Sequence, residues 1–417
     1  MSISAGVPFG VLSSPHNTAA PPANGDGQQV PTAFRFRHIP ALDGLRGLAC
    51  LMVIAIHMKL PTPGGFLGVD LFFVLSGFLI TALMLQEWDQ NRTVNLKKFY
   101  LRRVLRLYPA MLVMFAIVLA FCMAVLTREE YRQVRKGIVV SLLAQANNSI
   151  VIGPLPFMPF AYTWSLSIED KFYLIWPLVL CGLLSQESLS RRWKAGLVAV
   201  SILVCAALRA RMYYCFPQLI GALYSDAVCR ADSMLVGCLT AMLAVWNLLP
   251  SAPWFRTATK VASQVFLACL TYLMFYGDLA AGHLYYGTFT LIALGTAVVI
   301  INLIRSDARG LSAVLEHPLL TGTGRMSYGL YLWHVPVIIY FKRFHHPLTG
   351  HANYAYPESS TTYVVGILAV IYLIAGISYV FVEKPFLRLK PKVSHARLPI
   401  PAEDRAPAAA ESALRAA

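Results

Sequence analysis

Two residues in the segment Leu42–Met58, Arg46 and His57, have side chains that could take part in chemistry. The segment is otherwise largely apolar and is long enough to cross a bilayer. Ionisable groups are costly inside a membrane, so both are candidate functional residues. They lie eleven residues apart, which in a helix is about three turns and a rise of roughly 16 Å. We therefore expect both on one helix face, where they could contact the charged end and the reactive end of a long substrate.

A histidine in this position suits general-base catalysis. An unperturbed imidazole titrates close to neutral pH, so His57 could remove a proton from a hydroxyl group, which alone is a weak nucleophile. Asp70 and Glu169 are carboxylates that could hold one ring nitrogen and leave the other free as the base. The alternative is that His57 is a structural histidine packed between helices.

Arginines are the second chemical feature. Arg46 could pair with Asp43, three residues earlier, or bind a phosphate or a developing negative charge. A dense basic run before the third apolar span contains Lys97, Lys98, Arg102, Arg103 and Arg106. This run either fixes the membrane orientation and contacts anionic lipid, or binds the phosphates of a nucleotide, which guanidinium groups bind in bidentate geometry.

Further polar groups in apolar segments leave their roles open. Arg230 and Asp232 form either an ion pair inside the bundle or a contact to a polar acceptor. Glu383-Lys384-Pro385 is typical of a structural helix end. A polar and aromatic stripe in a later span comprises Ser327, Tyr328, Tyr331, Trp333 and His334.

Several functional classes lack their sequence signatures. The chain has no nucleotide-binding glycine loop, no His-Glu-x-x-His motif and no Gly-x-Ser-x-Gly elbow, and its eight cysteines lack metal-ligand spacing. We therefore expect no metal site, no ATP-driven transport and no ordinary serine hydrolysis. Cys215 and Cys229 flank an expected exterior loop and could form a disulfide in an oxidising compartment, although spacing alone does not establish pairing.

Composition indicates a membrane protein. Of the 417 residues, 57% are hydrophobic and 13% are charged, and the mean hydropathy is +0.59. Apolar stretches of membrane-spanning length recur along the chain. The net charge of +15 arises from basic residues in the connections, which is the positive-inside pattern and not a nucleic-acid-binding patch. We therefore expect an all-α polytopic protein in a lipid bilayer, with no nucleic-acid partner.

We expect ten spans, which begin near residues 42, 67, 107, 164, 194, 230, 259, 286, 322 and 362. The stretch Gly137–Ile152 is short and interrupted by polar residues, and counting it as a span would place the basic C-terminal flank outside. The positive-inside rule therefore favours ten spans with both termini cytoplasmic, Arg46 toward the cytoplasm and His57 toward the exterior. Residues 1–40 and 393–417 are expected to be disordered tails, and the first has no signal-peptide pattern.

Six sequence blocks, in order, resemble the membrane-bound acyltransferase 3 family. The first is the Arg-x10-His segment from Leu42 to His57. The others are Gly65–Phe78, Arg102–Pro109, Thr163–Pro177, Gly324–Pro336 and Phe381–Phe386. Together they extend over about residues 38–388, and several ordered blocks are far more specific than a single one.

The resemblance implies a transmembrane acyltransferase domain over residues 41–392, built from a bundle of about ten helices. Proteins of this family transfer acyl groups, usually acetyl from acetyl-CoA, to hydroxyls of surface polysaccharides, lipopolysaccharide, peptidoglycan, lipids or macrolides. By this resemblance His57 is the catalytic base, Arg46 is its essential companion and Glu169 is the acidic residue of its block. Three arginines are implied as donor-site groups: Arg102, Arg103 and Arg106.

Two features depart from the family pattern. Where the family commonly has Glu-Glu-Gln-Phe-Tyr, this chain has Glu169-Asp170-Lys171-Phe172-Tyr173, and Lys171 could pair with a neighbouring acid. The assignment of Glu169 as the second catalytic carboxylate is weakened by this. Some members also carry a C-terminal soluble esterase-like domain that is missing from this sequence, so an acceptor that needs it, such as peptidoglycan, is less expected.

The sequence thus predicts an acyltransferase of the bacterial inner membrane that transfers groups other than amino-acyl groups. Its donor substrate would be acetyl-CoA or another acyl-CoA, its acceptor a cell-surface polysaccharide or glycolipid, and no cofactor would be bound permanently. One alternative is acylation of a macrolide or lipid. Another is a non-catalytic glycan or lipid transporter, since intramembrane ionisable groups also mark transport paths. The sequence leaves open the acceptor, the acyl chain, the oligomeric state and the choice between direct transfer and an acyl-enzyme.

Overall fold

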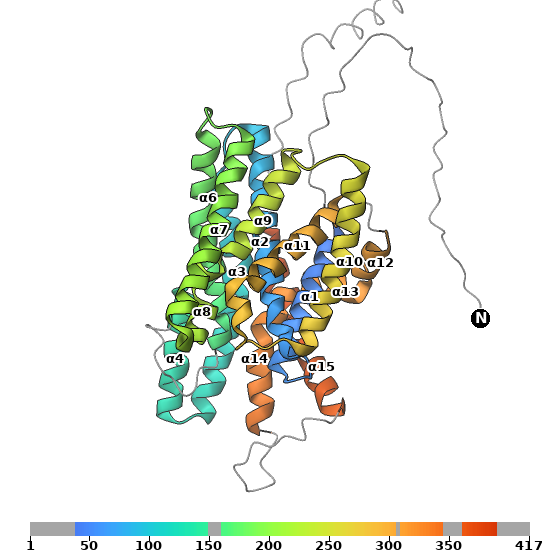
Figure 1. The fold of residues 1–417 in the computed structure, drawn as a ribbon. Coiled ribbons are helices and arrows are strands. Elements are labelled where there is room, and N and C mark those ends of the chain that lie inside the picture. Colours follow the sequence, from blue (N-terminus) through green and yellow to red (C-terminus); the bar gives the residue numbers. More distant parts are fainter. Residues whose placement is uncertain (1–37, 149–159, 306–308, 345–360, 390–417) are drawn as a thin grey trace, which may run out of the picture. The chain divides into compact units, whose positions relative to one another are not determined.

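The computed structural model describes residues 38–148, 160–305, 309–344 and 361–389, and all regular elements within these ranges are helices (Figure 1). The longer helices are α1 (Pro40–His57), α2 (Gly68–Asn91), α3 (Leu96–Val125), α4 (Arg128–Leu142), α6 (Trp164–Ser185), α7 (Arg191–Cys215), α9 (Ala227–Val245), α10 (Pro253–Tyr276), α11 (Phe289–Ile304), α14 (Ser327–Phe344) and α15 (Thr361–Ser378). Shorter segments connect them: η1 (Pro63–Leu67), η2 (Ala161–Thr163), η3 (Pro217–Leu219), α8 (Ile220–Ser225), η4 (Leu284–Thr288), α12 (Arg309–Leu315), α13 (Pro318–Arg325), η5 (Tyr379–Glu383) and α16 (Lys384–Arg388).

Eight helical segments within the described residues are long and apolar enough to cross a membrane. They coincide with eight of the ten expected spans, and the chain is a multi-pass membrane protein. The other two expected spans form the helices α6 and α14, which are 22 and 18 residues long but are not among the eight. Glu169, Asp170 and Lys171 reduce the apolar character of α6. The segment α4, which covers the start of the doubtful stretch, has only 15 residues and is also not among the eight.

Helix α1, which carries Arg46 and His57, and its neighbour α2 lie in the interior. Most residues of α1 and α2 are buried, and α2 packs along α9. A side-chain carbon at Gly77 would collide with the carbonyl of Met234, and one at Gly237 would collide with the carbonyl of Val74. Glycine at both crossing points lets the two backbones approach closely, as small residues do between membrane helices. This packing holds α1 and α2 in fixed positions within the bundle.

Two buried ion pairs fasten α2, α7 and α9 together. Arg230 of α9 donates a hydrogen bond to Asp70 of α2 over 2.6 Å, and Arg209 of α7 donates to Asp232 of α9 over 2.7 Å. All four side chains are fully buried. The two residues considered as a possible pair from the sequence, Arg230 and Asp232, therefore each bind a different helix. Two positions apart on one helix, their side chains point about 200° apart, so they cannot face each other.

The structure also bears on the considered disulfide and on the expected disordered tails. Cys215 and Cys229 both have free thiols, and Cys229 lies buried with its Sγ against Met212 Sδ at 3.7 Å, so the disulfide considered above is not formed. The expected disordered tails lie almost entirely outside the described residues, as does the connection between α14 and α15.

Candidate active site

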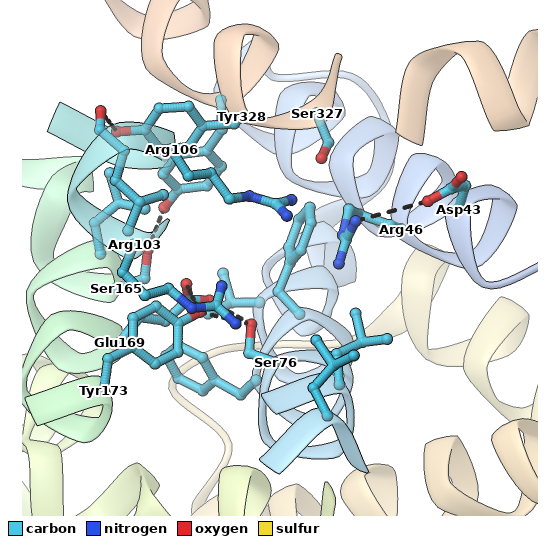
Figure 2. Close-up of a pocket in the computed structure, with 18 of the residues that line it drawn as sticks. Asp43, Arg46, Ser76, Arg103, Arg106, Ser165, Glu169, Tyr173, Ser327 and Tyr328 are labelled. Atoms are coloured by element: carbon cyan, nitrogen blue, oxygen red, sulfur yellow. Dashed lines mark hydrogen bonds and ion pairs between the residues drawn. The ribbon is translucent and has the colours of Figure 1, made fainter. Parts of the chain in front are cut away.

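A cavity of about 280 Å³ lies between α1, α2, α3, α6 and α14 (Figure 2). It brings together residues from five of the six sequence blocks quoted above, although these are far apart in the chain. The exposed His38 and the half-buried Asp43 are among its lining residues, so the cavity reaches the surface near the start of α1. Figure 2 shows the polar lining residues projecting into one space.

Three arginines line this cavity: Arg46, Arg103 and Arg106. The guanidinium groups of Arg46 and Arg106 point toward each other from opposite walls in Figure 2, and they repel electrostatically. Arg46 also approaches Asp43 at 3.7 Å, as its spacing on the helix predicts. Arg106 forms no ion pair or hydrogen bond within the described residues, although it interacts electrostatically with Glu383, and its hydrogen-bond donors can therefore bind an anion.

The guanidinium group of Arg103 lies against an aromatic ring. Its central carbon is 4.8 Å from the centre of the Tyr173 ring, a distance at which a cation and an aromatic face attract each other. This contact holds the arginine toward α6, and the hydrogen-bonding edge of the guanidinium group is not used by the protein within the described ranges.

Arg102 differs from its two neighbours. Helix α3 begins at Leu96, earlier than expected, so the basic run is helical and its side chains point in fixed directions. At about 100° per residue, Arg102 points about 100° away from Arg103 but only about 40° away from Arg106, so the helix period separates it from Arg103 and its partner on α2 separates it from Arg106. Arg102 is directed to Glu87 of α2, at 3.5 Å, and does not line the cavity. The structure thus brings together two of the three arginines predicted for the donor site.

Glu169 lies in the same cavity, among the arginines. Its carboxylate accepts hydrogen bonds from Ser76 at 3.3 Å and from Tyr173 at 2.8 Å, and it interacts electrostatically with Arg103 and Arg46. The lining therefore holds three guanidinium groups against two carboxylates, those of Asp43 and Glu169. A polar cavity with excess positive charge suits an anionic ligand such as a phosphate.

Lys171, which departs from the family pattern, has its own partner. It donates a hydrogen bond to the Asn147 side chain over 2.7 Å. Within the described residues, no hydrogen bond or ion pair joins Lys171 to Glu169 or Asp170. The carboxylate of Glu169 therefore interacts with the residues that line the cavity.

His57 is the last residue of α1 and does not line the arginine cavity. Its Nδ1 lies 2.8 Å from the carbonyl oxygen of Val53. A carbonyl can only accept a hydrogen bond, so Nδ1 carries the hydrogen and Nε2 keeps its lone pair. Nε2 has no hydrogen-bond partner in the part of the chain that the structure describes. The ring of His57 is therefore held as the tautomer that a general base requires, by the helix backbone.

Neither carboxylate proposed to orient His57 does so. Asp70 binds Arg230 and the hydroxyl of Ser233, the latter at 3.0 Å, and Glu169 binds Ser76 and Tyr173. The predicted hydrogen bond from His57 to Asp70 is wrong, because helix α9 packs against α2 and supplies Asp70 with a cation. The Val53 carbonyl, four residues before His57 on its own helix, takes the place of the carboxylate.

Aromatic side chains connect the cavity with His57. Tyr331 lines the cavity, and its ring centre lies 5.4 Å from that of His334. The ring of His334 in turn lies 4.8 Å from that of His57. Sequence reasoning found Tyr331 and His334 only as part of a stripe and missed Ser76 and Tyr173, both of which stand inside the quoted family blocks.

Comparison with known proteins identifies the family. The model of the acyltransferase 3 family, described as an acyltransferase domain, matches residues 39–381, which is most of the chain. The chain therefore belongs to this family. The cavity arginines, Glu169 and His57 all lie inside the matched region.

Several bacterial relatives are similar over most of the chain. The peptidoglycan O-acetyltransferase of Listeria monocytogenes is 31% identical over 322 residues, which are 74% of this chain and 50% of the relative. A Staphylococcus aureus protein with the provisional name of an O-acetyltransferase is 30% identical over 364 residues, 84% of this chain and 58% of the relative. A Bacillus subtilis protein, provisionally named a peptidoglycan O-acetyltransferase, is 30% identical over 365 residues, 84% and 55% respectively. The chain spans little more than half the length of these curated relatives, and no solved structure matches it.

Proposed function

We propose that this protein is an O-acyltransferase of the bacterial inner membrane that moves acetyl from acetyl-CoA to a hydroxyl of a cell-surface glycan. One observation carries the proposal: helix α1 presents Arg46 to a cation-rich cavity and, at its end, His57 with a free Nε2. The first group suits the phosphates of a CoA donor and the second suits deprotonation of a hydroxyl. The family match and the O-acetyltransferase names of the relatives support the same reaction.

In the proposed reaction, the donor would extend along α1 from Arg46 to His57. The phosphates of acetyl-CoA would lie against Arg46, Arg103 and Arg106, and the pantetheine arm would extend toward His57. Nε2 of His57 would take the proton of the acceptor hydroxyl while the oxygen attacks the thioester carbon. An oxygen–carbon bond forms, the carbon–sulfur bond breaks, and the proton passes from His57 to the departing sulfur. We propose direct transfer as the simplest path, without an acyl-enzyme.

Glu169 would act on the donor side of this reaction. It lies among the arginines and binds Ser76 and Tyr173. A carboxylate in that place offsets part of the repulsion between the arginines when no donor is bound. In this proposal Glu169 therefore orients the phosphate-binding groups, and Asp70 stabilises the bundle through Arg230.

Sidedness is part of the proposal. Arg191 at the start of α7 approaches Asp89 near the end of α2 at 3.7 Å, and Arg305 after α11 donates to the carbonyl of Pro250 over 2.8 Å. The first contact brings the α6–α7 connection to the α2–α3 connection, and the second brings the α11–α12 connection to the α9–α10 connection, as expected if the members of each pair lie on one membrane face. By the positive-inside rule this face is cytoplasmic, as are both termini, and acetyl-CoA would enter from there.

The test replaces His57. Membranes that contain the His57→Gln protein should transfer labelled acetyl from acetyl-CoA to cell-surface glycan at least about 100-fold more slowly than wild type, because a general base contributes a factor of this size. His283→Gln is the matched control, since His283 is exposed and its ring bonds, among the described residues, to Thr288 at 3.1 Å. Transfer at the normal rate by the His57→Gln protein would contradict the mechanism.

The acceptor needs a separate experiment. Ester-linked acetate should be lower on the surface glycans of a deletion strain than on those of its parent, and restored by the wild-type gene but not by His57→Gln. Separate analysis of peptidoglycan, polysaccharide and lipid fractions would identify the acceptor class. Unchanged acetate in all glycan fractions would move the acceptor to lipids or small molecules, and glycan or lipid movement without acetyl transfer would favour a transporter.

A further inference from the structure

His334 of α14 lies against His57 but has no part in the reaction described above. The centres of the two imidazole rings are 4.8 Å apart and their planes are inclined by 77°. His334 is fully buried, whereas His57 is half-buried. His334 therefore lies behind His57, where it can act on the base but not readily on the acceptor.

Hydrogen bonds define the tautomer of His334. Its Nδ1 lies 2.6 Å from the carbonyl oxygen of Tyr331, so Nδ1 carries the hydrogen and Nε2 has a lone pair. The same reasoning applies to His57 through Val53. Two neutral imidazoles are thus in contact, and each has Nε2 available as an acceptor.

Nε2 of His334 is buried and has no hydrogen-bond donor in the described ranges. Buried polar atoms in folded proteins are nearly always paired, and an exception calls for a specific explanation. The aromatic rings of Tyr162 and Tyr331 pack against His334, with ring centres 5.2 and 5.4 Å away, and restrict its orientation. The structure therefore maintains an unsatisfied acceptor next to the candidate base.

We propose that His334 is a positioning residue that acts through His57, by accepting a hydrogen bond from Nε2–H of His57 after His57 has taken the proton of the acceptor hydroxyl. This inference rests on the acyl transfer proposed above. The proton leaves the hydroxyl oxygen, is held on His57 by the hydrogen bond to His334, and ends on the CoA sulfur. His334 neither gains nor loses a proton overall. The two rings are in edge-to-face contact, so the two partners of this hydrogen bond are already neighbours in the bundle.

Two substitutions distinguish the roles of the two ring nitrogens of His334. In His334→Asn the amide nitrogen is attached to Cγ, like Nδ1, and can keep the bond to the Tyr331 carbonyl, but the Nε2 acceptor is lost. In His334→Gln the amide oxygen is as many bonds from Cα as Nε2 and can accept from His57, but the bond to Tyr331 is lost. A purely structural role therefore predicts that Asn is the milder change, and the proposal predicts that Gln is.

We expect His334→Asn to lower kcat by about 10- to 100-fold, because a hydrogen bond to a charged group is lost. KM for acetyl-CoA should change by less than about twofold, since the ground state of the donor complex does not contain this bond. His334→Gln should keep a higher kcat than His334→Asn. In the His57→Gln background, His334→Asn should cause no additional loss, because the two residues act as a unit.

Several outcomes would contradict the proposed role of His334. A normal kcat for His334→Asn, or a lower kcat for His334→Gln than for His334→Asn, would overturn the inference. If the His334→Asn protein does not reach the membrane, His334→Leu is compared with His334→Gln. Both variants lack the bond to Tyr331, and only the glutamine has an acceptor for His57. Equal kcat values for these two variants would also overturn the inference. If wild-type membranes transfer no acetyl from acetyl-CoA, the proposed function itself fails. Wild-type rates in all His334 variants together with an inactive His57→Gln protein reject this inference alone.

Discussion

The described part of this protein contains two groups of arginines, one between α2, α7 and α9 and the other at the cavity beside α1, α3 and α6, and the two groups differ in how they are paired. Arg209 and Arg230 are fully buried, and each binds one aspartate at 2.6 to 2.7 Å. Arg46 and Arg106 line a cavity, where cations outnumber carboxylates and face each other. Each arginine of the first group has one aspartate as its counter-ion, whereas the arginines at the cavity exceed the carboxylates in number.

We propose that this difference separates structural arginines from arginines that bind a ligand. A buried arginine with one aspartate has its charge neutralised inside the fold, so removing either partner leaves an uncompensated charge. Arginines that outnumber the carboxylates around a cavity repel one another in the empty protein, and an anion bound there relieves this repulsion. The first arrangement serves the bundle, whereas the second indicates a ligand. The predictions below test this contrast, from the largest expected effect to the smallest.

Breaking a balanced pair should have the largest effect. Asp232→Asn leaves Arg209 without its counter-ion and weakens the hydrogen bond that Thr290 donates to Asp232 over 2.6 Å. We expect a loss of about 3–5 kcal/mol in the free energy of unfolding, the usual cost of removing one partner of a buried pair. Thermal unfolding of the purified protein in detergent would measure it. The double variant Arg209→Leu with Asp232→Leu should recover much of the loss, and an unchanged unfolding temperature for Asp232→Asn would refute the structural role.

Removing an unbalanced arginine should affect the donor and not the fold. Arg106→Gln should raise KM for acetyl-CoA by about 10- to 100-fold, the cost of one lost hydrogen bond to a phosphate. Its unfolding temperature should remain the same or rise, because the repulsion with Arg46 is relieved. Steady-state kinetics and thermal unfolding of one preparation would check both. A strongly destabilised Arg106→Gln protein with normal KM would reverse the assignment of the two groups.

Arg102→Gln is the matched comparison and should have the smallest effect. Arg102 lies four residues before Arg106 on α3, but it is directed to Glu87 and not to the cavity. We expect KM for acetyl-CoA to change by less than about twofold, and the free energy of unfolding by about 0–1 kcal/mol, as for most partly exposed ion pairs. If Arg102→Gln raised KM as much as Arg106→Gln, donor binding would extend beyond the cavity described here.

Much of the architecture could be predicted from the sequence. The apolar segments gave the all-helical membrane class and eight of the spans, because a bilayer requires helices of defined length. The ordered blocks gave the family. The spacing of Arg46 and His57 gave their common helix, since side-chain direction along one helix follows from its 3.6-residue period.

Partners across helices could not be predicted in the same way. Asp70 and Arg230 are 160 residues apart, and only the close packing of α2 on α9 brings them together. His57 was assigned a carboxylate partner by analogy with catalytic triads, but the backbone carbonyl of Val53 takes that role.

The sequence by itself thus determined the membrane class, the family and the helix that carries Arg46 and His57, all of which depend on local periodicity and ordered motifs. Only the tertiary structure decided which charges are paired one to one inside the bundle and which line a cavity with excess positive charge. It separated Arg102 from Arg103 and Arg106, placed Glu169 among the arginines, and set His334 against His57. The physical reason is that the energy of a charge inside a membrane depends on its nearest partners, and these come from other helices.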